Sequence, residues 1–357
     1  MNIADEFLKH AHFVDKRANQ LSRDMLIELN KAHSSITGKL ATIQADVLNK
    51  PFLKASYARR KKVLTMQAQA IENIITDIFK EINVIIEDAA QDTLFGTAQA
   101  THGIISKAAP TINVDFTKLH LPVAKKWFET TTIAGLLPNE LINKLEASTR
   151  DKIISVSRQA LIQGKGTLSM ARMLKKQGIE GTYRGIEGLS RTLLLSASNY
   201  AKDELITENY SDVVKQWRYL ATLDGRTCLV CGADDHSLFK LNEYKPVLPQ
   251  HFNCRCTYVP VVENSIATGQ RPTGKHSERW VQHRDGTRSR KFTPDKVSHH
   301  IGFTGSYQAW LKEQLKTDPA FVKDILGPKR FELFSKGKLN LKAMVTDGRI
   351  KNLKKTM

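Results

Sequence analysis

Cysteine is scarce in this sequence, and its few copies are not spread along the chain. The 357 residues include four cysteines, all between positions 228 and 256. A disulfide framework would distribute its cysteines to staple a chain of this length. We therefore exclude a disulfide scaffold, and the clustering points to a metal site in a reducing compartment.

Long apolar runs are also missing. The first twenty residues carry six charged side chains, so they lack the apolar core of a signal peptide. The most apolar segment, residues 71–90, contains six charged residues and cannot span a bilayer without burying them. We expect a protein with no membrane anchor that is made in the cytoplasm.

Acidic residues are outnumbered by basic ones. The chain has 54 Lys and Arg against 36 Asp and Glu, a net charge of +18, and +12 of it lies between Gln250 and the C-terminus. This skew favours a polyanionic partner, nucleic acid before membrane. A basic surface that touches only acidic protein remains the alternative. Hydrophobic residues make up 41% of the chain, which argues against disorder throughout.

Helical periodicity dominates the first hundred residues. Residues 3–46 are predicted to form one helix, whose apolar positions are Val14, Ala18, Leu21, Met25, Leu29, Ala32 and Ile36. A second helix carries a heptad seam of Leu64, Ala68, Ile71, Ile75, Ile78, Ile82, Ile85 and Ala89. We expect residues 1–97 to form a helical arm, as a hairpin or a coiled coil. The hairpin is favoured because the partner helix is in the same chain.

The remaining chain divides by composition. Residues 98–136 read as a connector and residues 137–212 return to helix. Val213–Thr222 and Cys256–Val262 are predicted to be strands that pair, with Pro260 placing the second at an edge. Residues 263–305 are predicted to be a basic flexible loop and residues 306–357 a basic helical tail. The predicted fold class is α+β: mostly helical in the N-terminal two thirds, with a small zinc-stabilised core and a short antiparallel sheet over 137–262, then a basic C-terminal region of short helices.

The cysteine cluster has the spacing of a metal site. Cys228 and Cys231 form C-x2-C, and His251, Cys254 and Cys256 follow as H-x2-C-x-C. Two such pairs complete a tetrahedral, structural zinc site. We favour Cys228, Cys231, His251 and Cys254 as ligands, with Cys256 as the alternative. Buried cysteines without metal, or a redox C-x-x-C, are the competing interpretations.

A basic stretch follows this motif. Its predicted nucleic-acid contacts are Arg271, Lys275, Arg279, Arg284, Arg288, Arg290, Lys291 and Lys296. His276, His283, His299 and His300 are candidates for nuclease chemistry, but they have no accompanying triad or carboxylate pair in the sequence. Solvated histidines are therefore the preferred interpretation, and we expect no enzymatic activity.

The motif from Asp224 to Cys231, D-x-R-T-C-x-x-C, followed by His251, Cys254 and Cys256, resembles the phage Mu F-like minor head protein family. The helix–glycine–helix segment that starts at Ala160 fits the same family, and the resemblance covers about residues 140–262. The proline-rich start that the family shows before its histidine is reduced here to Pro249. The region after residue 262 is not matched.

The resemblance implies a minor capsid and head morphogenesis protein of a tailed bacteriophage. Its implied partners are the portal protein and the major capsid protein or a scaffold, with viral double-stranded DNA as a possible associate that leaves with the genome. The implied location is the virion head, in its interior or near the portal, after assembly in the host cytoplasm. The alternatives are a virion-borne nuclease or transferase in the C-terminal third, and a generic zinc-containing DNA-binding protein.

Overall fold

The computed structural model describes residues 3–48, 51–108, 122–262, 271–282, 288–301, 305–346 and 349–350. The chain divides into two compact units. We call the first the helical unit; it comprises Asp15–Phe95 and His120–Ala197. The second, the knot unit, comprises Met1–Val14, Gly96–Leu119 and Ser198–Met357.

The first helix, α1 (Ile3–Val47), confirms the prediction for residues 3–46. All seven predicted apolar positions are buried, and Leu40 and Ile43 extend the series. The buried positions repeat every eleven residues, as in Val14, Met25 and Ile36. Eleven residues in three turns is 3.67 residues per turn, close to the 3.6 of an α-helix, so the stripe stays on one face.

The second helix, α2 (Tyr57–Ala108), is longer than predicted and extends into the expected connector. Of the heptad seam, Ile71, Ile75 and Ile82 are buried, whereas Ile78 and the rest are only half-buried. The buried series is Val63, Gln67, Ile71, Ile75, Phe79, Ile82, Ile86 and Ala90. Its spacing is mostly four residues, so the packing face drifts away from the strict heptad that we assumed.

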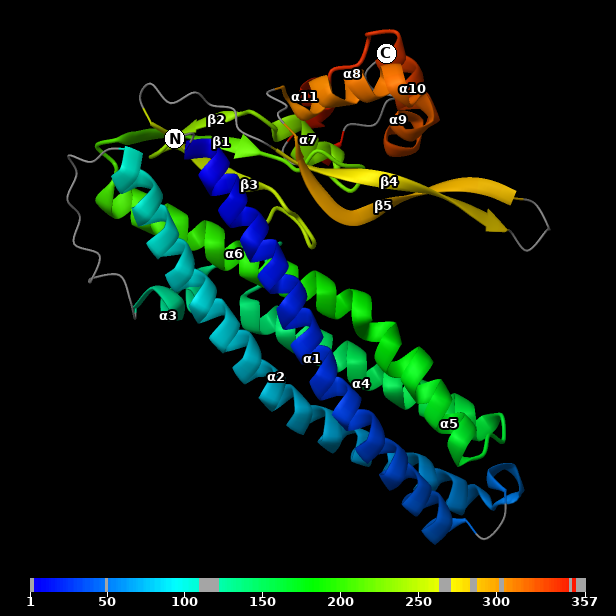
Figure 1. The fold of residues 1–357 in the computed structure, drawn as a ribbon. Helices are drawn as coiled ribbons and strands as arrows, with labels where there is room; N and C mark the ends of the chain where they lie inside the picture. The colour runs from blue at the N-terminus through cyan, green and yellow to red at the C-terminus, as the bar shows by residue number, and fades with distance from the viewer. Residues whose placement is uncertain are drawn as a thin grey trace. The chain divides into compact units, whose positions relative to one another are not determined.

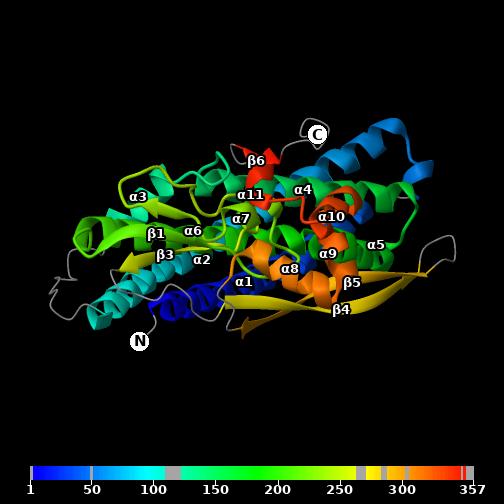
Figure 2. The same ribbon diagram turned by 90° about the horizontal axis from the view of Figure 1, so that it is seen from above.

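The helical unit is a bundle of four long helices. Arg17 of α1 pairs with Asp92 of α2 at 2.8 Å, so these helices form the predicted hairpin. Two further helices, α4 (Pro138–Ile162) and α6 (Tyr183–Asn209), run beside them (Figures 1 and 2). Side-chain contacts join the helices in pairs: Gln67 to Ser157 at 3.4 Å, and Asp15 to Arg191 at 2.7 Å. The α1–α2 hairpin thus shares its core with α4 and α6.

Short elements connect the long helices. Helix α3 (Pro122–Thr130) falls within the predicted connector. The predicted turn after α4 contains Gly164 with φ of +64°, a conformation that favours glycine. Helix α5 (Thr167–Met173), a π-helical turn η3 (Leu174–Ile179) and a 3-10 turn η4 (Glu180–Thr182) lead into α6. A 3-10 turn η1 (Phe52–Lys54) precedes α2.

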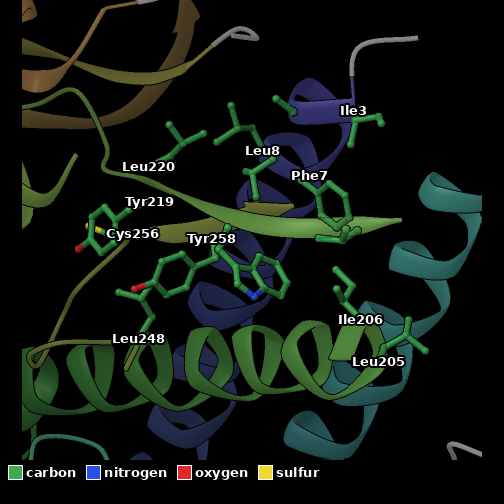
Figure 3. Close-up of a cluster of buried hydrophobic side chains, with 14 of the residues drawn as sticks. Ile3, Phe7, Leu8, Leu205, Ile206, Tyr219, Leu220, Leu248, Cys256 and Tyr258 are labelled. Carbon is green, nitrogen blue, oxygen red and sulfur yellow. The ribbon is translucent and has the colours of Figure 1, made fainter. Parts of the chain in front are cut away.

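The knot unit contains the predicted antiparallel sheet. Strands β1 (Val214–Leu220) and β3 (Thr257–Val262) pair as expected, and β2 (Leu238–Lys240) adds a third strand in the order β2-β1-β3. Pro260 therefore does lie in an edge strand. Figure 3 shows Tyr258 and Leu248 between this sheet and α6, with Phe7 and Leu8 contributed by α1.

The C-terminal third contains more structure than the sequence indicated. Where we expected a flexible loop, strands β4 (Arg271–Gln282) and β5 (Arg288–Ile301) pair as an antiparallel hairpin. The predicted short helices follow as α8 (Tyr307–Thr317), α9 (Pro319–Leu326), α10 (Pro328–Ser335) and α11 (Leu341–Met344). Strands β6 (Val345–Thr346) and β7 (Arg349–Ile350) form a last short pair. None of the helices in the described ranges has the length and apolar character needed to cross a membrane.

Candidate metal centre

The first pair of cysteines is placed by a short helix, α7 (Leu229–Asp234). Cys228 is its N-cap residue, and its Sγ accepts a hydrogen bond from the Cys231 backbone N–H at 3.3 Å. One helical turn separates the two residues, so both thiols point to the same side of the loop. The C-x2-C spacing therefore produces two convergent sulfur atoms.

The second group comes from the loop before β3. Asn253 adopts a φ of +66°, which asparagine tolerates better than most residues, and the Cys254 N–H bonds back to the His251 carbonyl at 3.0 Å. This turn brings the His251 ring and the Cys254 thiol to the same side. The Nδ1 of His251 lies 2.9 Å from the Phe252 carbonyl, which can only accept. Nδ1 is therefore the protonated nitrogen of the neutral ring, and Nε2 is left free to bind a metal.

The two groups meet around Cys231. The His251 Nε2 lies 3.2 Å from the Cys228 Sγ and 3.3 Å from the Cys231 Sγ, and the Cys231 and Cys254 Sγ atoms are 3.8 Å apart. Zinc with Zn–S of about 2.3 Å and Zn–N of about 2.0 Å places two tetrahedral sulfur ligands roughly 3.8 Å apart, and a sulfur and a nitrogen ligand roughly 3.5 Å apart. The sulfur–sulfur distance fits the first value, and the sulfur–nitrogen distances are a few tenths of an ångström shorter than the second. The donor set can hold a metal ion.

Cys256 also belongs to the cluster. Two groups of donors lie within ligand range: Cys228, Cys231 and His251 form one, and Cys231, Cys254 and Cys256 form the other. The sequence predicted that residue 256 begins a strand, but β3 begins at Thr257. Both alternatives for the fourth ligand therefore stay open, and Cys231 is common to both groups.

The hydrogen bonds within the cluster favour the anionic thiolate form of Cys228. The pKa of the Cys228 thiol is lowered to about 4, chiefly by its hydrogen bond with Cys231. The pKa of His251 is raised to about 9 by its hydrogen bond with Cys228. A metal cation bound to both residues would favour the deprotonated form of each, the thiolate of Cys228 and the neutral imidazole of His251.

Asp224 ties the two loops of the cluster together. Its buried carboxylate accepts two hydrogen bonds from the Arg255 guanidinium, at 2.6 and 2.7 Å. It also accepts from the backbone N–H groups of Arg226 and Thr227, at 3.0 and 3.1 Å. Burial is the largest single influence and would raise the pKa of Asp224, but the charges and hydrogen bonds of Arg255 and Arg226 together outweigh it and the pKa is lowered. Asp224 and Arg255 therefore have a structural role, since their ion pair holds the two loops together.

The C-terminal helices pack directly on the cluster. The Tyr307 hydroxyl of α8 donates to the Asp224 carbonyl at 2.9 Å, and the Tyr307 ring lies against Gly232 of α7. Leu223, Leu229 and Trp310 belong to the same buried core. The region after residue 262, which the resemblance did not cover, is thus part of the same folded unit.

Arg271 was predicted to contact nucleic acid, and this prediction is wrong. Its guanidinium is buried, with 2% of the residue exposed, and pairs with both oxygens of Asp235 at 2.8 and 3.0 Å. It also bonds to the carbonyls of Ala221 and Gly305. Arg271 therefore closes the base of the β4–β5 hairpin. The sequence showed its positive charge but not the buried carboxylate opposite it.

The side-chain positions of the other predicted nucleic-acid contacts are not described. Six of them lie in β4 and β5, where the structure describes the backbone but not these side chains: Lys275, Arg279, Arg288, Arg290, Lys291 and Lys296. Arg284 and His283 lie outside the described residues. The backbone register sets Arg279 opposite Lys291. These residues stay predictions.

Lys202 is a buried residue that sequence reasoning missed. Its ammonium donates to the Thr257 hydroxyl and, at 3.2 Å, to the Tyr258 carbonyl. Burial lowers the pKa of Lys202 to about 7. A lysine in the middle of a helix carries no sequence signal for burial, since lysine is almost never fully buried.

Residues 151–259 match the family described as Phage Mu protein F like protein. No curated protein and no solved structure matches the chain. The matched segment ends in β3 and includes all five candidate metal ligands. The resemblance that the cysteine motif indicated is confirmed by this match: residues 151–259 are similar to the phage Mu F-like proteins.

Proposed function

We propose that this chain is a minor structural protein of a tailed-phage head, assembled with the portal protein and the major capsid protein or a scaffold, and that it is not an enzyme. The observation that carries the proposal is the family match over residues 151–259. The polar groups beside the cluster support a structural role, because Asp224 and Arg255 of the matched segment and Tyr307 of α8 are occupied with one another.

The Cys/His cluster is proposed to hold one structural zinc ion. Cys228, Cys231, His251 and Cys254 would be the ligands, with Cys256 as the alternative. A bound zinc would crosslink α7 to the loop before β3, and four protein ligands would leave no open coordination position. The C-terminal helices that pack on α7 would then depend on the same ion for their support.

Association with double-stranded DNA is the finer part of the proposal. It rests on the basic residues of the β4–β5 hairpin, now without Arg271. Each phosphate neutralised steepens the fall of log affinity against log salt by roughly 0.9. The full chain should therefore bind two unrelated duplexes equally and with steep salt dependence. Arg279→Ala/Lys291→Ala should reduce that slope by about 2.

Assembly into heads is tested by fractionating infected or induced cells that produce the chain. Particles are separated on a density gradient and probed with an antibody to the protein. We expect the chain to sediment with DNA-filled heads and with procapsids. A chain that stays at the top of the gradient while capsid protein sediments would refute the head assignment. Nucleic-acid cleavage that is lost in His283→Ala/His299→Ala would instead identify the enzyme alternative.

A further inference from the structure

Positive charge is concentrated in two stretches far apart in the sequence. Residues 37–69 and 155–179 together carry twelve Lys and Arg and a single acidic residue, Asp46. Their net charge of +11 compares with +18 for the whole chain. Outside these stretches and the basic C-terminal region, the protein has a net charge of −5. The charge is therefore local and not a general property of the surface.

The fold brings both stretches to one end of the helical unit, which we call the bundle tip. Phe52, Val63 and Leu161 pack in one small core, so η1 and the start of α2 lie against the end of α4. The His33 Nε2 lies 2.9 Å from the Ala171 carbonyl, which places α5 beside α1. Figures 1 and 2 both show α5 near the α1–α2 connection. Ten basic side chains of the tip are exposed: Lys39, Lys54, Arg59, Lys61, Lys62, Arg158, Lys165, Arg172, Lys175 and Lys176.

The positive charges at the start of α2 do not stabilise the helix. The first two turns of α2 carry four basic residues, Arg59, Arg60, Lys61 and Lys62. Its first turn contains no acidic residue. The amino end of a helix carries a partial positive charge, so each cation near it costs roughly 0.3–1 kcal/mol. Folding gives no reason for this placement. An external anion at the tip would be attracted by both the side chains and the helix end.

The tip also exposes large apolar side chains beside the charges. Leu53, Tyr57, Ile162 and Leu168 are 56%, 73%, 59% and 76% exposed. They lie on either side of the two adjoining connections: Leu53 in η1 and Tyr57 at the start of α2, and Ile162 at the end of α4 and Leu168 at the start of α5. Binding to a nucleic-acid backbone would use the charges but leave these side chains in water. An anionic bilayer accommodates both, because basic groups contact the headgroups while apolar groups enter the boundary with the acyl chains.

We propose that the bundle tip docks on an anionic phospholipid bilayer as a peripheral membrane-binding surface. The lysines and arginines contact the headgroup phosphates, and Leu53, Tyr57, Ile162 and Leu168 insert at the interface. This activity is additional to the proposed role in the head. It requires no membrane-crossing segment.

The test uses the full chain and vesicles of phosphatidylcholine with or without 40% phosphatidylglycerol, separated by flotation. We expect binding to the anionic vesicles, weakened by salt, and none to pure phosphatidylcholine. Lys61→Glu/Lys62→Glu should weaken binding at least tenfold. The matched control, Lys329→Glu/Lys342→Glu, makes the same change in net charge at exposed lysines of the knot unit and should bind nearly as wild type. Circular dichroism checks that every variant keeps its helix content.

The apolar contribution is tested separately. Leu53→Ser/Leu168→Ser should lower affinity for anionic vesicles several-fold, whereas Leu238→Ser/Val247→Ser, at exposed sites of the knot unit, should not. Two results overturn the proposal. One is wild-type protein that does not float with anionic vesicles at low salt. The other combines two observations: charge reversal at the tip abolishes binding to duplex DNA, and Leu53→Ser/Leu168→Ser leaves vesicle binding unaffected. That outcome would make the tip a nucleic-acid-binding surface.

Discussion

At the scale of single residues, the buried lysine gives the clearest dependence of stability on pH. Burial lowers the pKa of Lys202 to about 7, while an unfolded lysine titrates near 10.4. Between these two pH values the lysine is protonated in the unfolded chain but neutral in the folded one. The free energy of unfolding therefore rises as the pH rises from 7 to 10, and burying this lysine destabilises the fold most below pH 7. The slope is at most about 1.4 kcal/mol per pH unit.

Lys202→Met should remove this dependence. Methionine has a similar length and needs no hydration, so the variant should be more stable than wild type at pH 7, and the difference should shrink toward pH 10. Urea unfolding of both proteins across this range measures it. A constant difference between the two proteins at every pH would show that the ammonium stays charged in the fold.

The ion pair between buried Asp224 and partly buried Arg255 supports the loops of the candidate metal centre. Asp224→Ala leaves the Arg255 guanidinium without this carboxylate; breaking a fully buried pair typically costs about 3–5 kcal/mol, and we expect a cost near the lower end of that range. Asp212→Ala, at an exposed site in the same unit, should change the free energy of unfolding by less than about 0.5 kcal/mol. Equal effects of the two substitutions in denaturant titrations would show that the pair does not stabilise the fold.

At the scale of elements, α7 and α8 depend on a glycine contact. A Cβ at position 232 would collide with the Tyr307 ring, which is itself fully buried. Gly232→Ala should therefore displace α8 and destabilise the knot unit by about 1–3 kcal/mol, as overpacking does. Gly38→Ala, in an open position of α1, should instead stabilise by about 0.5–1 kcal/mol. Thermal melts compare the two, and a neutral Gly232→Ala would contradict the packing described here.

The packing face of α2 makes a second prediction at this scale. Ile82 is buried and Val84, two residues on, is 55% exposed. Ile82→Asp should unfold the helical bundle because it buries a charge in the core, whereas Val84→Asp should leave the helical circular dichroism signal unchanged. Loss of helix in both variants would mean that another molecule covers the outer face of α2.

How much of each element could be predicted follows from how local its signal is. The apolar period of α1 and the β-branched residues of β1 and β3 are local, and these elements were found within a few residues of their bounds. The seam of α2 was placed only in part, because a heptad assumption cannot follow a stripe that drifts toward Phe79 and Ile86. The β4–β5 hairpin was missed because its residues include glycine, proline and many charges.

The candidate site divides in the same way. The gathering of the five candidate metal ligands was predicted, since short spacing along the chain brings each group together. Arg271 was misassigned and Lys202 was missed, because their burial depends on Asp235 and on Thr257 from distant segments. Charge composition cannot separate a buried arginine from an exposed one.

At the scale of the whole molecule, the distribution of charge over the surface depends on the fold as well as on the sequence. The sequence showed the +12 in the C-terminal third because those residues are consecutive. It did not show the basic bundle tip, whose two stretches are about a hundred residues apart and meet only because α4 ends beside η1. The helical unit therefore carries a basic surface of its own, in addition to the basic C-terminal region of the sequence.

The central claim is that the Mu F-like segment is built around one structural zinc ion, and metal analysis of the purified full chain tests it most directly. Mass spectrometry of the metal content should give about one zinc per wild-type chain and little in Cys231→Ser, which removes the thiol common to both donor groups. Cys256→Ser should keep the zinc if His251 completes the site. A chelator should lower the Tm of the wild type, since metal binding is linked to folding. A wild-type protein without metal, with a Tm equal to that of Cys231→Ser and unchanged by the chelator, would contradict the claim.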